Sequence, residues 1–383
     1  MFEKALSGSR GYWTWVVFLL AVIGVGFLMY LRQLAVGLGI TGMSRDVSWG
    51  LYIAQFTFLV GVAASAVMVV LPYYLHNYKL FGKMTILGEF LAIAAVIMCL
   101  LFVFVDMGQP FRVMNVILHP TPRSVMFWDM LVCMGYLILN VLISRVSLDS
   151  ERKGIAPPKW IKPFIIISIP WAISIHTVTA FLYSGLAARP FWLTAIMTPR
   201  FLATAFAAGP AFLLLICFLL RRISRFDVGD EPIRKLAIII TYAMAANLFF
   251  LLLEIFTAYY SGMSEHTVHF NYLFFGLGGA RILVPWMWVS VTLGALSLLL
   301  LFVPKWRNNL RILPWTCALI FISIWIDKGM GLVIAGFVPS VLNQVTQYSP
   351  TGPEVLISLA VWAIGLLVLT VLYKIALTVR RQV

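Results

Sequence analysis

The chain has 383 residues, of which 62% are hydrophobic and only 11% are charged. A composition this apolar excludes a water-soluble domain and indicates a protein with many membrane spans. The net charge of +14 invites comparison with nucleic-acid-binding proteins, but the basic residues lie in short links between apolar runs, as in membrane proteins. We therefore expect the lipid bilayer, and no nucleic acid, as a partner.

Ten apolar runs are long enough to cross a hydrocarbon core about 30 Å thick, which takes about 20 helical residues. They cover residues 13–37, 49–76, 84–106, 124–145, 164–185, 201–221, 236–261, 281–303, 312–327 and 354–376. The first run is too long for a signal-peptide core and is expected to be a retained span. The ninth ends at Asp327 and Lys328, and the apolar segment after it is expected to dip back into the membrane. The sequence thus predicts an all-α polytopic membrane protein with a single membrane domain over residues 1–383.

Lysine and arginine residues fall unevenly on the two sides of these spans. Of the 28 in the chain, 20 lie on one side, among them Lys4, Arg225 and Arg381, and 8 lie on the other. Because basic links remain in the cytoplasm, we expect a multi-pass protein of the cytoplasmic (inner) membrane with both termini inside. The links facing outward are then 38–48, 106–129, 186–200, 262–280 and 328–353.

Several cofactors are disfavoured by the residues that would bind them. The four cysteines, none at CxxC spacing, lie inside apolar runs, so no iron–sulfur cluster is expected in this chain. Only His176 lies deep in a span, whereas b-type haem needs paired histidines. No HxxxH or ExxH spacing occurs within a span, so no metal site is expected.

The link from Asp106 to Asp129 is the most polar stretch among the apolar runs. It holds two aspartates, two arginines, a histidine and a glutamine in 24 residues. Placing ionisable groups near hydrocarbon is costly and usually marks function. We interpret this link as the rim of a quinone pocket at the outer face.

A quinone needs hydrogen-bond partners for its carbonyls and a group that exchanges protons beside one of them. His176 suits the exchange because its pKa lies near ambient pH, and Thr179 and Tyr183 follow it on the same helix face. Asp106 or Asp129 would orient the imidazole, and Arg112 or Arg123 would hold that carboxylate. The expected ring contacts are Trp49, Tyr52 and Trp128.

A path for protons is expected from the cytoplasmic side. Glu89, with Tyr73, Tyr74 and His76, would form an inner half-channel, and Glu254 is a second buried carboxylate for such a path. Alternatively, Glu89 pairs with a lysine such as Lys83 at a helix end.

Simpler explanations of the site residues remain open. A lone histidine in a span can be a structural hydrogen bonder, and Asp106 can simply end its helix. Outer tryptophans and tyrosines often belong to the aromatic belt, and outer arginines can extend their charged heads to water. The clustering of these groups, rather than any one of them, favours a functional site.

Several stretches resemble a known family along almost the whole chain. They are VSWGLYIAQFTFLVGVAASA, DMGQPFRVMNVILHPTPRSVMFWD, IPWAISIHTVTAFLYSG, EIFTAYYSG, WIDKGMGLVIAGFVPS and YSPTGPE. They resemble the NrfD / polysulfide reductase (PsrC-like) family of quinone-interacting membrane subunits, in particular its DsrP-type members, which belong to DsrMKJOP complexes of sulfur- and sulfate-metabolising microbes.

The resemblance implies two four-helix bundles, residues 49–185 with the quinone site and 201–327, flanked by spans 13–37 and 354–376. It implies menaquinone as substrate, no haem or iron–sulfur cluster in this chain, and the site residues Asp106, Arg112, Arg123, Asp129 and His176. The implied partners are a periplasmic ferredoxin-like iron–sulfur subunit, a multihaem cytochrome c and further membrane subunits. Some members carry a quinone-contacting His and Asn on the first span, where this chain has Arg32 and Gln33.

Two other functions remain possible from the sequence. Ten spans, a possible parallel repeat and buried carboxylates at Glu89 and Glu254 would suit a secondary transporter, although the Gly and Pro breaks gather at span ends rather than at midplane. A membrane anchor without chemistry is the third interpretation, and it predicts no quinone binding.

Overall fold

The structure is a computed structural model that describes residues 7–63, 65–76, 78–224 and 226–380. Ten of its helical segments are long and apolar enough to cross a membrane, which confirms the predicted number of spans. They are α1 (Arg10–Val36), α2 (Leu51–Ala63) continued by α3 (Val67–Leu75), η3 (Lys79–Phe81) continued by α4 (Gly82–Asp106), α6 (Val125–Lys153), α7 (Ile161–Ser184), α8 (Met197–Ile223), α9 (Asp230–Tyr260), α11 (Leu283–Phe302), α13 (Leu313–Ile324) continued by η6 (Trp325–Gly331) and α14 (Leu332–Ala335), and α15 (Gly352–Arg380). The links carry η2 (Leu38–Ile40), η4 (Pro110–Arg112), α5 (Asn115–Leu118), η5 (Pro190–Trp192), α10 (Ser264–Phe274) and α12 (Pro304–Arg307).

The ninth span does not end where the sequence predicted. It continues from Leu313 to Ala335, and its π-helical part η6 carries Asp327 and Lys328, both buried. The prediction that these two residues end the span and open an outer link is therefore wrong. The helix continues because an arginine of α8 neutralises Asp327 inside the protein, a partner that hydropathy alone does not reveal.

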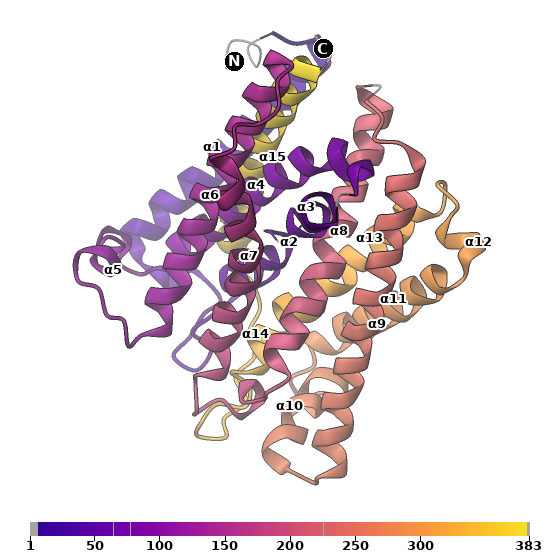
Figure 1. Ribbon diagram of the computed structural model, residues 1–383. Coiled ribbons are helices and arrows are strands. Elements are labelled where there is room, and N and C mark those ends of the chain that lie inside the picture. The colour runs from indigo at the N-terminus through magenta and orange to yellow at the C-terminus, as the bar shows by residue number, and fades with distance from the viewer. Residues whose placement is uncertain (1–6, 64, 77, 225, 381–383) are drawn as a thin grey trace.

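We call α2, α4, α6 and α7 the first helix group, and α8, α9, α11 and α13 with its continuation η6 the second. Helices α2 and α8 pack against each other, and the predicted division into two four-helix bundles stays a prediction. In the first group, α2 packs on α4, α4 on α6, and α6 on α7; in the second, α8 packs on α9, and α13 on both α8 and α11. The flanking helices α1 and α15 lie side by side, and α15 rests on α4 (Figure 1). The two helices that flank the groups in sequence therefore both cover the first group in space.

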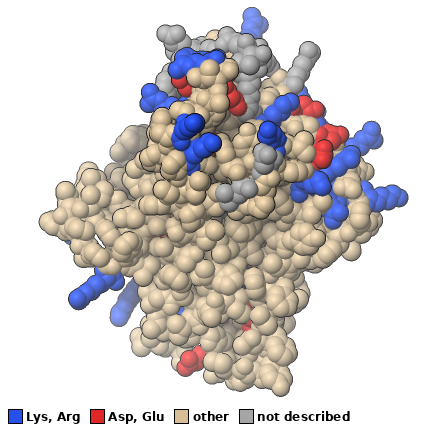
Figure 2. Space-filling view, in the orientation of Figure 1, with Lys and Arg blue, Asp and Glu red and all other residues tan. Residues whose placement is uncertain are grey.

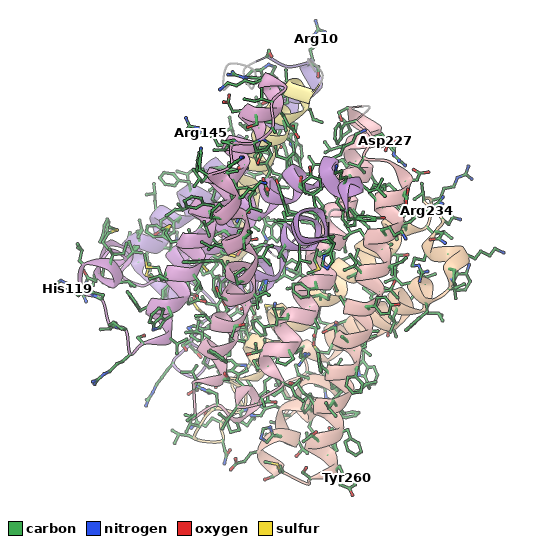
Figure 3. All side chains as sticks on the ribbon, in the orientation of Figure 1. Arg10, His119, Arg145, Asp227, Arg234 and Tyr260 are labelled. Carbon is green, nitrogen blue, oxygen red and sulfur yellow. The ribbon has the colours of Figure 1, made fainter. Side chains whose placement is uncertain are left out.

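Charge is concentrated at one end of the molecule. Both termini lie at this basic end (Figure 1), where most of the visible Lys and Arg side chains gather (Figure 2). Arg10, Arg145 and Arg234 lie toward it, whereas Tyr260 marks the distal end (Figure 3). Lys4, Arg225 and Arg381 lie outside the described residues. The asymmetry agrees with the sequence, and the cytoplasmic placement of the basic end stays a prediction.

A buried carboxylate fixes the start of α15 to the start of α2. Glu354 accepts hydrogen bonds from the backbone N–H of Gly42 at 3.0 Å, from that of Leu51 at 3.1 Å and from the Tyr348 hydroxyl. Gly50 makes this approach possible, because a Cβ there would lie 2.5 Å from the Tyr348 hydroxyl. A negative charge at the first residue of α2 also suits the helix dipole.

Replacing Glu354 with leucine is therefore expected to lower the free energy of unfolding by about 2–5 kcal/mol, because the Gly42 N–H and the Tyr348 hydroxyl lose their acceptor inside the protein. Thermal unfolding in detergent measures the loss. Glu231, exposed at the start of α9, is the matched control, and its change to leucine should leave the melting temperature close to that of the unmodified chain. Equal effects at the two positions would refute a special role for Glu354.

Candidate functional site

Helix α7 presents a row of polar side chains to the interior of the first helix group. His176, Thr179 and Tyr183 follow one another at i, i+3 and i+7, and all are fully buried. This spacing places them on one face of the helix. The predicted polar face of the fifth span is therefore present and points inward.

Two hydrogen bonds fix this face to its neighbours. The Thr179 hydroxyl donates to Asp129 Oδ1 of α6 at 2.6 Å, and the hydroxyls of Tyr183 and Thr57 of α2 are hydrogen-bonded to each other. Asp129 thus binds Thr179 rather than the imidazole that it was expected to orient. Neither ring nitrogen of His176 has a hydrogen-bond partner among the described residues. The imidazole is therefore buried without a polar contact in the described structure.

A second polar group lies where α1, α2 and α4 meet. Tyr52 donates to Gln33 Oε1 at 2.8 Å, and the Gln33 amide donates to the Val105 carbonyl at 2.7 Å. Asp106 follows directly, and its Oδ1 is buried with no partner among the described residues. Asp106 lies within electrostatic range of Tyr52 and Tyr183. The two predicted carboxylates Asp106 and Asp129 therefore both lie within electrostatic range of Tyr183.

Gln33 joins this polar group, although the sequence assigned it no role. Its only signal in the sequence is its polarity within the apolar first span. Its burial and its bond to Tyr52 identify it as part of the cluster.

Aromatic rings line the distal end of this region. Trp49 meets Tyr183 edge-on, with ring centroids 5.6 Å apart, and stacks on Trp192 of η5 at 5.7 Å. Trp192 is fully buried and was missed, because a lone tryptophan in a link looks like a belt residue. Trp128 does not join this group. It is 45% exposed, and its indole N–H donates to the Pro122 carbonyl of its own link at 2.7 Å.

The link between α4 and α6 does not fold over the site. Phe111 is 87% exposed, and His119 lies on a projection away from the helices (Figure 3). Arg112 and Arg123 are exposed, and neither forms an ion pair with Asp106 or Asp129 in the described structure. Of the polar side chains in this link, only those at its two ends, Asp106 and Asp129, reach the interior.

The residues predicted for a proton path fall in two places. Glu89 is buried in α4, within electrostatic range of Tyr74 and Tyr136, while His76 is exposed at the end of α3. The buried face of α6 continues from Asp129 toward the basic end with Cys133, Tyr136, Asn140 and Ser144. A polar stripe therefore connects the Glu89 region to the Asp129 region along one helix.

Glu254 belongs to a separate cluster in the second helix group. Arg200 of α8 forms an ion pair with Glu254 of α9 through Nη1 and with Asp327 of η6 through Nη2, which lies 2.8 Å from each Asp327 oxygen. Lys328 lies beside them. The sequence analysis assigned no site role to Arg200, Asp327 and Lys328, because all three were expected at span ends. The adjacent acid and base in WIDKG are the only sequence feature that could have indicated the cluster.

A cavity of about 290 Å³, partly open at the distal end, reaches this cluster. Its lining includes Arg200, Glu254 and His266 among apolar side chains such as Phe191 and Leu332. Helix α10 forms one wall and is held by His269, whose Nδ1 lies 2.7 Å from the Ala335 carbonyl and 2.9 Å from that of Val338. Burial lowers the pKa of His269, so it serves here as a neutral structural donor.

Metal ligands do not converge anywhere in the described part of the chain, where no group of three or more His, Cys, Asp or Glu side chains is placed to hold an ion. The candidate site is instead a set of buried proton-exchanging and hydrogen-bonding groups near aromatic rings. Such a set can bind a flat polar ring and move protons to or from it.

Comparison with known proteins gives consistent results. A chain from Halobacterium salinarum, described as a membrane subunit of a dimethyl sulfoxide reductase, is 27% identical, with 94% of this chain and 89% of the relative covered. The Hdr-like menaquinol oxidoreductase integral membrane subunit of Archaeoglobus fulgidus is 24% identical, covering 81% and 76%. The menaquinone reductase integral membrane subunit of Nitratidesulfovibrio vulgaris is 23% identical, covering 94% and 90%.

The model of the family described as polysulphide reductase, NrfD, matches residues 39–339, which include every residue of both clusters except Gln33. This match confirms the resemblance seen in the sequence, and the chain belongs to the polysulphide reductase NrfD family.

Proposed function

We propose that the chain is the quinone-interacting membrane subunit of an electron-transfer complex. In this proposal, menaquinol or menaquinone binds in the first helix group near the distal end, which faces the periplasm. Electrons pass between the quinone and an iron–sulfur subunit docked on that face, and further on to a multihaem cytochrome c. The names of the relatives, two of which mention menaquinol or menaquinone, support the substrate.

The observation that carries the proposal is His176. Its imidazole is 1% exposed, and neither nitrogen has a hydrogen-bond partner in the described structure. A buried polar group left without a partner costs about 1–3 kcal/mol. This cost is understandable if a bound ligand supplies the missing partner, and a quinone carbonyl does so. Asp106, with one oxygen also unpartnered, is the second such group in the same region.

The surrounding residues then have defined tasks. Trp49 and Tyr52 contact the ring and its carbonyls, Thr179 holds Asp129, and Tyr183 joins α7 to α2. His176 exchanges a proton with the quinone oxygen, and Asp129 and Asp106 supply or accept protons nearby. Arg112, Arg123 and Trp128, exposed on or beside the projecting link, are better placed to meet a partner protein or lipid headgroups than the ring.

The decisive experiment uses the chain purified within its complex. A menaquinol analogue should reduce the haem or iron–sulfur centres of the partner subunits, and His176→Ala or Asp106→Asn should abolish that reduction. Arg145→Gln, at the basic end, should not affect it. Full quinol-dependent reduction in the His176 and Asp106 variants would overturn the proposed site. We propose that the partners are those of the DsrP-type complexes of sulfur or sulfate metabolism. Identification of the subunits that copurify with the chain tests this.

Protons consumed or released at the site are proposed to pass along α6 to Glu89 and the basic end. We therefore expect Glu89→Gln to lower the rate of quinone-linked proton uptake from the basic side by about 10²-fold, because an amide cannot exchange protons. Proteoliposomes containing the complex and an internal pH-sensitive dye measure this uptake.

The control for Glu89 is Glu151→Gln at the basic end of α6, which should leave the uptake unchanged. Unchanged uptake in Glu89→Gln would eliminate the half-channel and leave Glu89 a structural role.

A secondary transporter is the second candidate, favoured by the cavity that ends at the buried Arg200–Glu254 pair. A transporter would move an ion or solute through liposomes without any redox partner. Flux by the purified chain in the absence of quinol would support it, and flux only during quinol turnover would support the electron-transfer role.

A further inference from the structure

Four buried charged side chains form one cluster between the two helix groups. They are Arg200, Glu254, Asp327 and Lys328, and none of them is more than 10% exposed. Arg200 contacts both carboxylates, whereas no ion pair joins Lys328 to a carboxylate among the described residues. The guanidinium is therefore shared by two acids, and the ammonium stands apart.

The Lys328 ammonium lies at the contact between α8 and α2. Its Nζ lies 4.2 Å from the centre of the Phe201 ring of α8 and 3.5 Å from the Phe201 carbonyl. A Cβ on Gly61 of α2 would be 3.2 Å from it, so the glycine makes room for the ammonium at this contact. Asp327 and Lys328 are consecutive in η6 and therefore project in different directions.

Few other titratable groups surround the two ends of this cluster. His176, Cys99, Arg200 and Asp327 lie within electrostatic range of Lys328. Arg200, Asp327 and His266 lie within range of Glu254. Lys328 thus lies against Gly61 of α2 and within electrostatic range of His176, and Glu254 lines the distal cavity.

Charge counting gives this cluster two neutral states. Arg200 stays protonated in proteins. With both carboxylates ionised, a protonated Lys328 makes the total charge zero; with one carboxyl protonated, a neutral Lys328 amine does so as well. Burying a net charge in a membrane protein is costly, so the neutral states are the accessible ones. They differ only in the position of one proton.

We propose that Lys328 and Glu254 exchange a proton across the Arg200–Asp327 pair and so connect the His176 side of the first helix group to the distal cavity. At rest Lys328 is an ammonium and both carboxylates are ionised. During quinol oxidation, the ammonium gives its proton to the Glu254 carboxylate, which produces the second neutral state. The Glu254 carboxyl then releases this proton to water in the cavity as the Lys328 amine accepts a new proton from the His176 side. Each group returns to its starting state, and the reverse sequence serves quinone reduction. The direction in which protons move rests on the proposed function, whereas the balance of charge among the four side chains does not.

Infrared spectroscopy of the isolated chain in detergent tests the charge sharing without any quinone. In Lys328→Met, only Arg200 remains to balance two carboxylates, so one carboxyl should become protonated at neutral pH. The spectrum of the variant minus that of the unmodified chain should gain the C=O stretching band of one carboxyl group. The double variant Lys328→Met/Glu254→Gln should lose the band, because its cluster is neutral again. The exposed Lys305→Met is the control and should add no band.

Absence of a new carboxyl band in Lys328→Met would overturn the proposal, because both carboxylates would then be stable without the ammonium. If this variant does not fold, the charge-balanced double variant still tests the route. It should lose proton release at the distal side while it retains its melting temperature, and unchanged release would refute the route.

Function is tested in the complex by separating kcat from KM. Glu254→Ala should lower kcat for quinol oxidation by about 10²-fold and leave KM unchanged, because the quinone contacts remain. Acetate, small enough for the cavity, should restore part of the rate. The exposed Glu265→Ala on α10 should behave like the unmodified chain. A wild-type complex without any quinol oxidation would refute the proposed function, whereas a normal wild type with an unaffected Glu254→Ala would refute only the proton route.

Discussion

Replacing Arg200 with methionine is expected to lower the free energy of unfolding by about 3–5 kcal/mol, because it leaves two buried carboxylates without their shared counter-charge. The side chains of Arg200, Glu254 and Asp327 are each no more than about a tenth exposed, and the Asp327 contact has 2.8 Å geometry to both oxygens. Thermal or denaturant unfolding in detergent measures the change. Lysine at this position should recover only part of the loss, because a single ammonium cannot place separate nitrogens against the two carboxylates as the planar guanidinium does.

A charge-balanced double variant provides the control for this result. Arg200→Met combined with Glu254→Gln leaves only Asp327 and Lys328 in the cluster, whose charges cancel, and should restore most of the stability. Arg112→Met, on the exposed link, should have almost no effect. A single Arg200→Met variant as stable as the unmodified chain would mean that water reaches the carboxylates freely, which would contradict the closed ionic cluster.

Replacing His176 with phenylalanine should have the largest effect on activity and little effect on stability. Loss of a general acid–base group lowers rates by about 10²–10⁴-fold. The imidazole makes no hydrogen bond in the described structure, so an apolar ring of similar size removes no stabilising contact. Menaquinol-dependent reduction of the complex and the melting temperature are the two measurements.

A structural histidine would give the opposite combination. Its loss would reduce the melting temperature and leave the rate per folded molecule unchanged. His119→Phe, on the projecting link, is the matched control and should alter neither quantity. A normal rate in His176→Phe would place quinone chemistry elsewhere, whatever the stability.

Hydropathy and charge were sufficient to predict the ten spans and the all-α architecture. The spacing of His176, Thr179 and Tyr183 also predicted their shared face, because helical geometry is local. The sequence could not indicate that Asp129 bonds to Thr179, that Gln33 bonds to Tyr52, or that Trp192 lies beside Trp49. Those partners lie on different helices, and their contacts depend on how the helices pack.

The link between α4 and α6 is the clearest difference. Its polar residues look like a single cluster in the sequence, yet only Asp106 and Asp129 point inward. Asp106 is the last residue of α4, and Asp129 lies in the first two turns of α6, so both are held by helices. Arg112, His119 and Arg123 are carried outward with the link.

By itself the sequence determined which segments cross the membrane and which family the chain resembles, because the cost of hydrocarbon burial acts on each segment separately. Only the tertiary structure decided that the ninth span continues past Asp327 and Lys328. A charged pair inside a span is stable only when a partner lies within contact distance, and Arg200 comes from a helix more than a hundred residues away.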